Sequence, residues 1–241
     1  MSQLALSSEA GVTPRHVSFV ESGRANPSRE MVLTLARALD VPLRERNQML
    51  LAAGYAPLYR ETGLDADELA QVRAALERML EHHEPFPAVV MDRHWNVIMA
   101  NAPATAMFEF LLGAEDGGDP PNVVRLMFGP LRPHVANWEQ TGEALVQRVH
   151  REAVGGVPDP ETVRLLEDVL ALPGVPAEWR TPDFGAGALP ILPVEFARDD
   201  VEVSYFSMVT TVGTPQDVTL QEIRVEAFFP ADGRSRAHRW G

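Results

Sequence analysis

The sequence QLALSSEAGVTPRHVSFVESGRANPSREMVLTLARALDVP, residues 3–42, contains the start and stop signals of short helices joined by tight turns. Gly11 follows the first apolar segment, and glycine most readily takes the left-handed conformation that ends a helix. Thr13 and Pro14 then form a helix start, since threonine caps the free N–H groups and proline occupies the first helical position at no cost. Ser22 and Gly23 mark the next stop. The predicted helices are 3–10 and 14–21.

A second pair of helices follows in the same style. Ser28 is a candidate N-cap, and Asp40-Val41-Pro42 ends the helix after it, because a residue before proline is driven out of helical geometry. A fourth helix over 43–53 ends at Gly54. The apolar positions of the third helix recur at helical spacing: Met31, Val32, Leu35, Ala36 and Leu39. Residues 1–60 are therefore expected to form a compact helical domain.

This order of helices and turns resembles the lambda-repressor-like, XRE-type helix-turn-helix. The resemblance implies that 3–10 is the first motif helix and that 14–21 is the recognition helix, whose N-terminal side chains reach base edges in the major groove of DNA. Arg15 would pair with guanine, Ser18 and Phe19 would reach a base or a thymine methyl, and His16 would touch phosphate. The implied DNA-binding residues are Gln3, Thr13, Pro14, Arg15, His16, Ser18, Phe19 and Arg24, of which Gln3, Thr13 and Arg24 would contact the backbone.

One departure from that family pattern concerns the start of the chain. The family normally carries another helix ahead of the motif, with an arginine that pairs with the glutamate at position 21. Met1 here stands about one helix too late. We therefore expect the first helix to be missing and Glu21 to lack its partner. A misassigned start explains this better than impaired DNA binding, since the sequence from Gln3 onward is otherwise complete.

Charge divides the chain into two parts. The 241 residues carry a formal net charge of −13, but residues 1–60 hold seven arginines and five acidic residues, whereas residues 61–241 hold fourteen arginines and 29 acidic residues. A head of +2 on a body of −15 indicates two domains with different partners. The absence of cysteine excludes disulfides and cysteine-ligated metals. No apolar run reaches the roughly 18 residues of a membrane helix, and no signal peptide opens the chain, so a cytoplasmic, nucleoid-associated protein with no membrane partner is expected.

A connector helix is predicted within residues 61–86. Asp65 and Glu68 have the spacing of a capping box. The apolar face of the helix is Leu69, Val72, Leu76, Met79 and Leu80. That face would pack either on the body or on the same helix of a second chain. His82 and His83 are adjacent and diverge on a helix, so no metal site is expected.

The body, residues 87–241, combines strands and helices. The predicted strands are 88–92, 95–100, 191–198, 201–212 and 219–229. The order strand, Asp92, strand, Asn101, helix resembles the opening of a PAS domain. The fold class is therefore α+β: an all-α head and a PAS-like, five-stranded antiparallel sheet with helices over one face.

The whole sequence resembles bacterial regulators that join an XRE head to an MmyB-like ligand-binding domain. The blocks that carry the resemblance are HVSFVESGRANPSREMV, VPLRERNQMLLAAGYAP, HEPFPAVVMDRHWNVIMAN, NVVRLMF, Asn137-Trp138 and FSMVTTVGTPQDVTLQEIRVEAFFPAD. It implies a PAS-like sensor of an apolar small molecule joined to a head that binds double-stranded DNA. We further expect the chain to form a homodimer. Known members are associated with a fatty acid, so a bound fatty acid is the expected ligand. No cofactor is expected to be required.

The residues of the body are compatible with such a ligand. An acyl chain needs an apolar cavity, to which methionine adapts well, and a cation for its carboxylate. Arg125 is the charged residue within the apolar run 122–128, and Arg132 lies close behind. The candidate ligand-binding residues are Met99, Met107, Arg125, Phe128, Arg132, Trp138, Phe206 and Met208. Most of these residues are of the kinds that more often form an ordinary packed core, and a packed sensor core would have the same composition.

An enzyme is not expected, because the sequence holds no nucleophile elbow, zinc-protease motif or phosphate-binding loop. The alternating residues Glu222, Arg224 and Glu226 predict a strand with one solvent-exposed face. The alternative to a regulator is a PAS-like dimerisation or protein-interaction module with impaired DNA binding and no small ligand.

Overall fold

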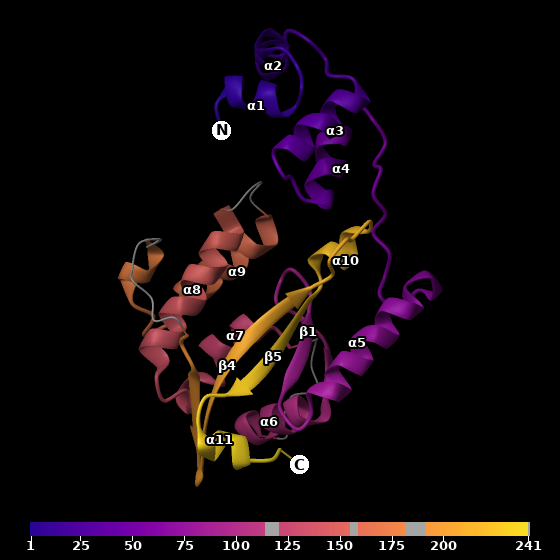
Figure 1. Ribbon diagram of the computed structural model, residues 1–241. Coiled ribbons are helices and arrows are strands. Elements are labelled where there is room, and N and C mark those ends of the chain that lie inside the picture. The colour runs from indigo at the N-terminus through magenta and orange to yellow at the C-terminus, as the bar shows by residue number, and fades with distance from the viewer. Residues whose placement is uncertain (114–120, 155–158, 182–190, 241) are drawn as a thin grey trace. The chain divides into compact units, whose positions relative to one another are not determined.

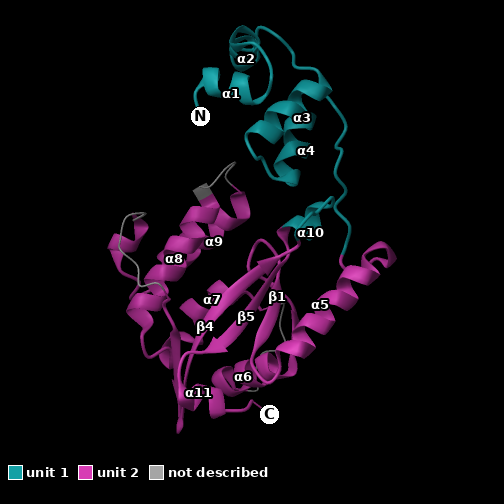
Figure 2. Cartoon of the chain, viewed as in Figure 1, with its two compact units in different colours: residues 1–63, 213–221 teal, residues 64–212, 222–241 magenta. Residues whose placement is uncertain are grey.

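The computed structural model describes residues 1–113, 121–154, 159–181 and 191–240. The chain forms two compact units (Figure 2): residues 1–63 with 213–221, and residues 64–212 with 222–241. Within the described ranges, no helix has the length and apolar character needed to cross a membrane.

The first unit contains the expected helices (Figure 1). They are α1 (Gln3–Glu9), α2 (Pro14–Glu21), α3 (Arg29–Ala38) and α4 (Leu43–Ala52). The predicted caps are in place, since Thr13 accepts a hydrogen bond from the His16 N–H and Ser28 from the Met31 N–H. Gly11 has a φ of +64°, which satisfies the left-handed turn after α1. The helical head is therefore confirmed.

A small apolar core joins these helices. Leu6 of α1, Val17 of α2 and Leu35 of α3 are buried together, and Val12 from the turn packs against them. Because each helix contributes one face to this core, the polar faces of α1 and α2 remain at the surface.

A segment far along the chain completes the first unit. The Asp217 carboxylate accepts hydrogen bonds from the Thr62 N–H and, at 2.7 Å, from the Thr62 hydroxyl. The Val218 N–H donates to the Arg60 carbonyl at 2.8 Å, and the Leu43 N–H, at the start of α4, donates to Gln221 Oε1 at 2.6 Å. The loop 213–221 is thus held by the residues that precede position 64.

The predicted strand from 219 begins too early. Residues Val218–Glu222 form helix α10 instead. The Asp217 carboxylate caps the start of this helix, because it accepts a hydrogen bond from the Thr219 N–H. Strand β5 begins at Arg224.

The second unit is built on a five-stranded antiparallel sheet, as predicted. Its strands, in the spatial order β2-β1-β5-β4-β3, are β1 (Ala88–Met91), β2 (Val97–Ala100), β3 (Val194–Arg198), β4 (Val201–Thr211) and β5 (Arg224–Pro230). The long pairing of β4 with β5 runs from Tyr205–Pro230 to Thr211–Arg224. The loop between these two strands is the segment that belongs to the first unit.

Helices cover both faces of this sheet. Residues of α6 (Ala102–Leu112), α7 (Val123–Phe128) and α8 (Trp138–Val154) lie over one face, where they line a cavity with β4 and β5. Helix α9 (Pro160–Leu170) packs on α8, and α11 (Gly233–Ala237) packs near the beginning of β4. Helix α5 (Ala70–His83) lies along the other face (Figure 1), which differs from the predicted one-sided arrangement.

Helix α5 also starts later than predicted. One 3₁₀ turn, Asp67–Leu69, precedes it, and the N-cap of that turn is Ala66, which has no side chain to accept a hydrogen bond. The capping box at Asp65 is therefore not formed. Leu69, Leu76 and Leu80 are buried in the chain's own second unit, so this part of the apolar face packs on the body.

The Asn101 side chain, which is 5% exposed, ties three elements together. Its Oδ1 accepts hydrogen bonds from the Ala88 N–H at 2.9 Å, where β1 begins, and from the Ala104 N–H at 3.0 Å, where α6 begins. Its Nδ2 donates to the carbonyls of Leu80, in the last turn of α5, and of Phe86, between α5 and β1. A single amide thus sets where α5 ends and where β1 and α6 begin.

Replacing Asn101 with alanine should lower the free energy of unfolding of the second unit by about 3 kcal/mol. The change removes an N-cap, worth about 1 kcal/mol, and leaves buried backbone groups unpaired at about 1–3 kcal/mol each. All four tryptophans lie in the second unit, so tryptophan fluorescence during urea unfolding measures it selectively. Asn26→Ala, at an exposed position of the first unit, should leave that transition unchanged. A loss below 1 kcal/mol for Asn101→Ala would contradict this assignment.

Candidate functional site

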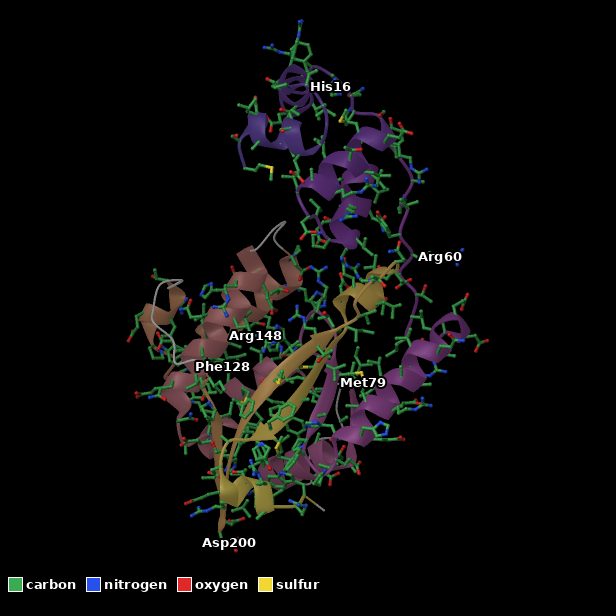
Figure 3. The ribbon with its side chains drawn as sticks, viewed as in Figure 1. His16, Arg60, Met79, Phe128, Arg148 and Asp200 are labelled. Atoms are coloured by element: carbon green, nitrogen blue, oxygen red, sulfur yellow. The ribbon has the colours of Figure 1, made fainter. Side chains whose placement is uncertain are left out.

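The surface formed by α1, the turn and α2 presents the side chains that the sequence predicted for contact with DNA. Thr13, Pro14 and Arg15 are exposed at the start of α2, and Arg24 is exposed just after it. The Arg15 guanidinium lies 5.1 Å from the centre of the Phe19 ring, so one turn of the helix presents both residues together. His16, labelled on α2 in Figure 3, is half-buried, as are Ser18 and Phe19.

Glu21 pairs with no arginine in the described residues, but it does have a hydrogen-bond partner within the unit. Gln3 Nε2 donates a hydrogen bond to the Glu21 carboxylate at 2.5 Å. The start of α1 and the end of α2 lie close enough for this bond because both helices pack on the same core. Gln3, predicted as a backbone contact to DNA, is therefore engaged within the unit, although it remains exposed.

The second unit holds an apolar cavity of about 180 Å³ between the sheet and helices α6, α7 and α8. Its walls are mostly aliphatic, aromatic and sulfur-containing side chains, whereas four polar side chains gather on β4, β5 and α8. The polar lining residues are Thr141, Arg148, Ser207 and Glu226, and the apolar ones include Val89, Trp95, Met107, Phe108, Leu145 and Phe228. An apolar space with a few convergent polar groups is the usual form of a small-molecule site.

A tight turn delivers Trp95 to this cavity. Trp95 is 1% exposed and has a φ of +70°, an uncommon backbone conformation for a residue with a side chain. Asp92 stabilises the turn, because its Oδ1 accepts hydrogen bonds from the His94 N–H at 2.8 Å and the Asn96 N–H at 2.9 Å. The aspartate after β1 therefore fixes the position of the indole ring.

Charged side chains surround the indole ring. The guanidinium groups of Arg148 and Arg224 lie 4.3 Å and 5.7 Å from its centre. The ring N–H donates to Glu152 Oε2 at 3.0 Å, and Arg224 donates to Glu152 Oε1 at 2.7 Å. Cations favour the face of an indole, so this arrangement holds two arginines beside an apolar space. Figure 3 labels Arg148 on α8.

Comparison with known families matches both units. The model described as "MmyB-like transcription regulator ligand binding domain" matches residues 72–240, which is more than half of the chain. The chain belongs to the MmyB-like transcription regulators. A model described as "Helix-turn-helix" matches residues 1–46. These families are those of transcription regulators rather than enzymes, and they assign DNA binding to the first unit and ligand binding to the second.

Other comparisons add little to this assignment. A search of curated proteins finds no match to this MmyB-like regulator. Among solved structures, "Structure of an RNA-binding Light-Oxygen-Voltage Receptor" is similar over 93% of this chain and 52% of that one, with 16% identity and a TM-score of 0.31. The regulator therefore spans about half the length of that structure.

The cavity of this MmyB-like regulator includes one of the eight predicted ligand-binding residues, Met107. Met99, Phe206 and Met208 lie on the opposite face of the sheet. Met99 pairs with Val90, which in turn pairs with Val225 beside α5, and Phe206 stacks on Phe229. The prediction assigned these three side chains to the cavity face because the strand pattern alone does not say which face is covered by which helices.

The remaining predicted residues are engaged elsewhere in the regulator. Arg125 pairs with Asp168 at 2.7 Å on the surface, and Arg132 donates to the carbonyls of Pro173 and Gly174, both at 2.8 Å. Phe128 and Trp138 pack edge to face, with ring centres 4.9 Å apart, in the core beside the cavity. Neither arginine lines the apolar cavity.

Arg125 instead borders a second, polar hollow of about 580 Å³, which also includes His94 and Asp159. Burial raises the pKa of the Asp159 carboxyl, but hydrogen bonds from Thr162 and the charges of Arg93 and His94 outweigh it and hold that pKa below its ordinary value. This carboxylate also caps α9. The hollow is thus bordered by a structural ion-pair cluster. In the described residues, no group of three or more histidine, aspartate or glutamate side chains is arranged to hold a metal ion.

The polar residues of the cavity were missed by sequence reasoning. The sequence pattern predicts a solvent-exposed strand face for Glu226 and Arg224, but Glu226 is 8% exposed and that face carries the cavity wall. Arg148 had no distinguishing pattern, since it is one charged residue of a long amphipathic helix. A usable signal was the charge alternation in β5 itself, because a charged face on the central strand of a covered sheet must find partners.

Proposed function

We propose that this chain is a transcription regulator whose DNA binding responds to a fatty acid or a similar apolar acid held in the second unit. The observation that carries the proposal is the apolar cavity with Arg148 at its polar side. The guanidinium of Arg148 stands over the Trp95 ring, and its nearest carboxylate contacts, with Glu152 and Glu226, are both 3.7 Å long. Those contacts are too long for hydrogen bonds, so the cation retains donors for a ligand carboxylate.

The energetics of an acyl chain agree with this proposal. Burial of each CH₂ group contributes about 0.8 kcal/mol, and the lining side chains Met107, Phe108 and Leu145 supply apolar contacts. Part of that gain offsets the cost of ordering the chain and of association. A carboxylate paired with Arg148 would fix the orientation of the ligand, while the apolar walls provide most of the affinity.

The route from ligand to DNA that we propose runs through β4 and β5. Ser207 on β4 and Glu226 and Phe228 on β5 line the cavity. The same two strands continue into the loop 213–221, which Asp217 and Gln221 fasten to Thr62 and to the start of α4 in the first unit. A ligand that prefers one arrangement of these strands would shift the population of loop positions, and hence of the first unit.

A homodimer is part of the proposal. A helix-turn-helix regulator reads two half-sites about 34 Å apart through a two-fold symmetric pair of chains. A coupling route that shifts the first unit would then change the spacing of two recognition helices. The acidic body would keep contact with DNA confined to the head, so binding should be salt-sensitive.

Two substitutions should separate base recognition from backbone contact. After selection of an operator from random duplexes, Arg15→Ala should cost about 1–3 kcal/mol on the best sequence and relax its preference. Arg24→Ala should weaken all sequences alike and reduce the salt slope by about 1. Fluorescence anisotropy over a salt series measures both. A folded protein that retains no DNA at low salt would remove the regulator proposal and favour the interaction module without DNA binding.

The ligand proposal is tested with dodecanoate. Native mass spectrometry should detect a bound acyl chain after purification, and Arg148→Ala should weaken dodecanoate binding about tenfold to a hundredfold, the usual loss of a charged hydrogen bond. Arg125→Ala is the matched control, because that arginine lies outside the apolar cavity, and its affinity should be unchanged. An equal loss in both variants, or none in Arg148→Ala, would contradict the assignment. A folded protein that does not bind dodecanoate would favour the alternative function, a dimerisation or protein-interaction module with no small ligand.

The coupling route is tested at Asp217. Asp217→Ala removes the hydrogen bonds that hold the loop 213–221 to Thr62, so it should abolish the effect of dodecanoate on DNA affinity while dodecanoate and DNA each still bind. Asp200→Ala, in the turn between β3 and β4, should leave the effect intact. Full ligand response in Asp217→Ala would show that the signal takes another path.

A further inference from the structure

The polar side of the cavity offers two separate binding capacities that the protein itself leaves unused. Glu152 is satisfied, since Arg224 and the Trp95 ring N–H occupy its two oxygens at 2.7 Å and 3.0 Å. Arg148 and Glu226 are the other charged pair, and they differ from the first in being poorly matched to each other. Their closest atoms, Nη1 and Oε1, are 3.7 Å apart.

Arg148 supplies an unused donor set. Its guanidinium carries five N–H groups, and it makes no hydrogen bond to any residue in the described part of the chain. Its stacking on Trp95 holds the plane of the group without using those N–H donors. An acceptor with negative charge, such as a carboxylate, is the matching partner.

Glu226 supplies an unused acceptor. Its Oε1 accepts a hydrogen bond from the Ser207 hydroxyl at 2.5 Å, which fixes the carboxylate between β5 and β4. Its other oxygen accepts no hydrogen bond from the residues that the structure describes. Glu226 lines the cavity, and this second oxygen keeps accessible surface, so it can accept a hydrogen bond from a donor that enters the space.

A plain fatty acid matches only half of this site. Its carboxylate would satisfy Arg148, but it would then stand near Glu226 and offer that carboxylate no donor. The two arginines and two glutamates beside the cavity already balance in charge. A ligand carboxylate next to the Glu226 carboxylate would therefore add a negative charge without a matching cation, which is unfavourable in apolar surroundings. A hydroxyl group beside the ligand carboxylate removes the conflict, because it donates to Glu226.

We propose that the cavity is specific for a hydroxylated acyl chain, with the carboxylate bound by Arg148 and a hydroxyl one or two carbons away donated to Glu226. Ser207 is the positioning residue, since it orients Glu226 from the neighbouring strand. A hydroxyl close to the carboxylate is required because Arg148 and Glu226 are adjacent, with Nη1 3.7 Å from Oε1. This inference rests on the proposed function, as it specifies the ligand class of the same cavity.

The test compares three ligands on the full chain by isothermal titration: dodecanoate, 2-hydroxydodecanoate and 3-hydroxydodecanoate. One of the hydroxylated acids should bind at least about tenfold more tightly than dodecanoate, because a hydrogen bond to a charged group contributes about that much. Equal affinity for all three would overturn the inference and leave the fatty-acid proposal intact. Failure of all three to bind would overturn both.

Two variants locate the effect. Glu226→Gln should lower the preference for the hydroxylated acid and strengthen dodecanoate binding, because the amide N–H₂ group can donate to the carboxylate. Ser207→Ala, which frees Glu226 to turn, should reduce the preference for the hydroxylated acid. Glu195→Gln, at an exposed position of β3, is the control and should behave as the wild type. A preference that survives in a folded Glu226→Gln protein, or in Ser207→Ala should Glu226→Gln not fold, would overturn the assignment.

Discussion

The buried amide of Asn101 is the contact on which the second unit depends. Its four hydrogen bonds set the end of α5, the beginning of β1 and the beginning of α6. Two of those elements then carry cavity walls, through Val89 on β1 and through Met107 and Phe108 on α6. The position of the apolar space is therefore determined by a group that never touches it. Burial explains why the contact is strong, since any of these backbone groups would otherwise lie unpaired in an apolar interior.

A second constraint arises from placing charge beside that space. Arg148, Glu152, Arg224 and Glu226 come from one helix and one strand, and the protein satisfies them unevenly. Glu152 is bonded on both oxygens, whereas Arg148 and Glu226 face each other at a distance too long for a hydrogen bond. A ligand that supplies hydrogen bonds to Arg148 and Glu226 would complete this uneven pairing. These residues would thus couple ligand binding to the stability of the second unit, because a ligand that binds only the folded state stabilises it.

The parts of the fold that follow from local chemistry were predictable from the sequence. Helix boundaries at Thr13-Pro14, Ser28 and Gly11 depend on local backbone chemistry that does not change with the rest of the fold. The strands of the body follow from their β-branched residues. The cavity was not predictable to the same degree. Whether Met99 or Val89 faces the cavity changes with a shift of one residue, and it is decided by helices packed from distant parts of the chain. Arg125 interrupts an apolar run, which predicts a charge inside a cavity, yet that position lies at the surface beside Asp168. Glu226 alternates with apolar residues, which predicts exposure to solvent, yet it is buried. The local sequence pattern shows that residues alternate between the two faces of a strand, but tertiary packing decides what covers each face of the sheet.

The membership of residues 213–221 in the first unit has a consequence for how such proteins are taken apart and recombined. The DNA-binding unit is discontinuous in sequence, because the chain leaves it after residue 63 and returns for one loop before leaving again. A fragment that stops at residue 63 lacks the Asp217 carboxylate and the Gln221 amide that hold Thr62 and the start of α4. A single crossover therefore cannot exchange the head of this protein for that of a relative without also mismatching the hairpin loop. Heads and bodies of this architecture are expected to be inherited as matched pairs, and a functional chimera must transplant the loop together with the helices that it contacts.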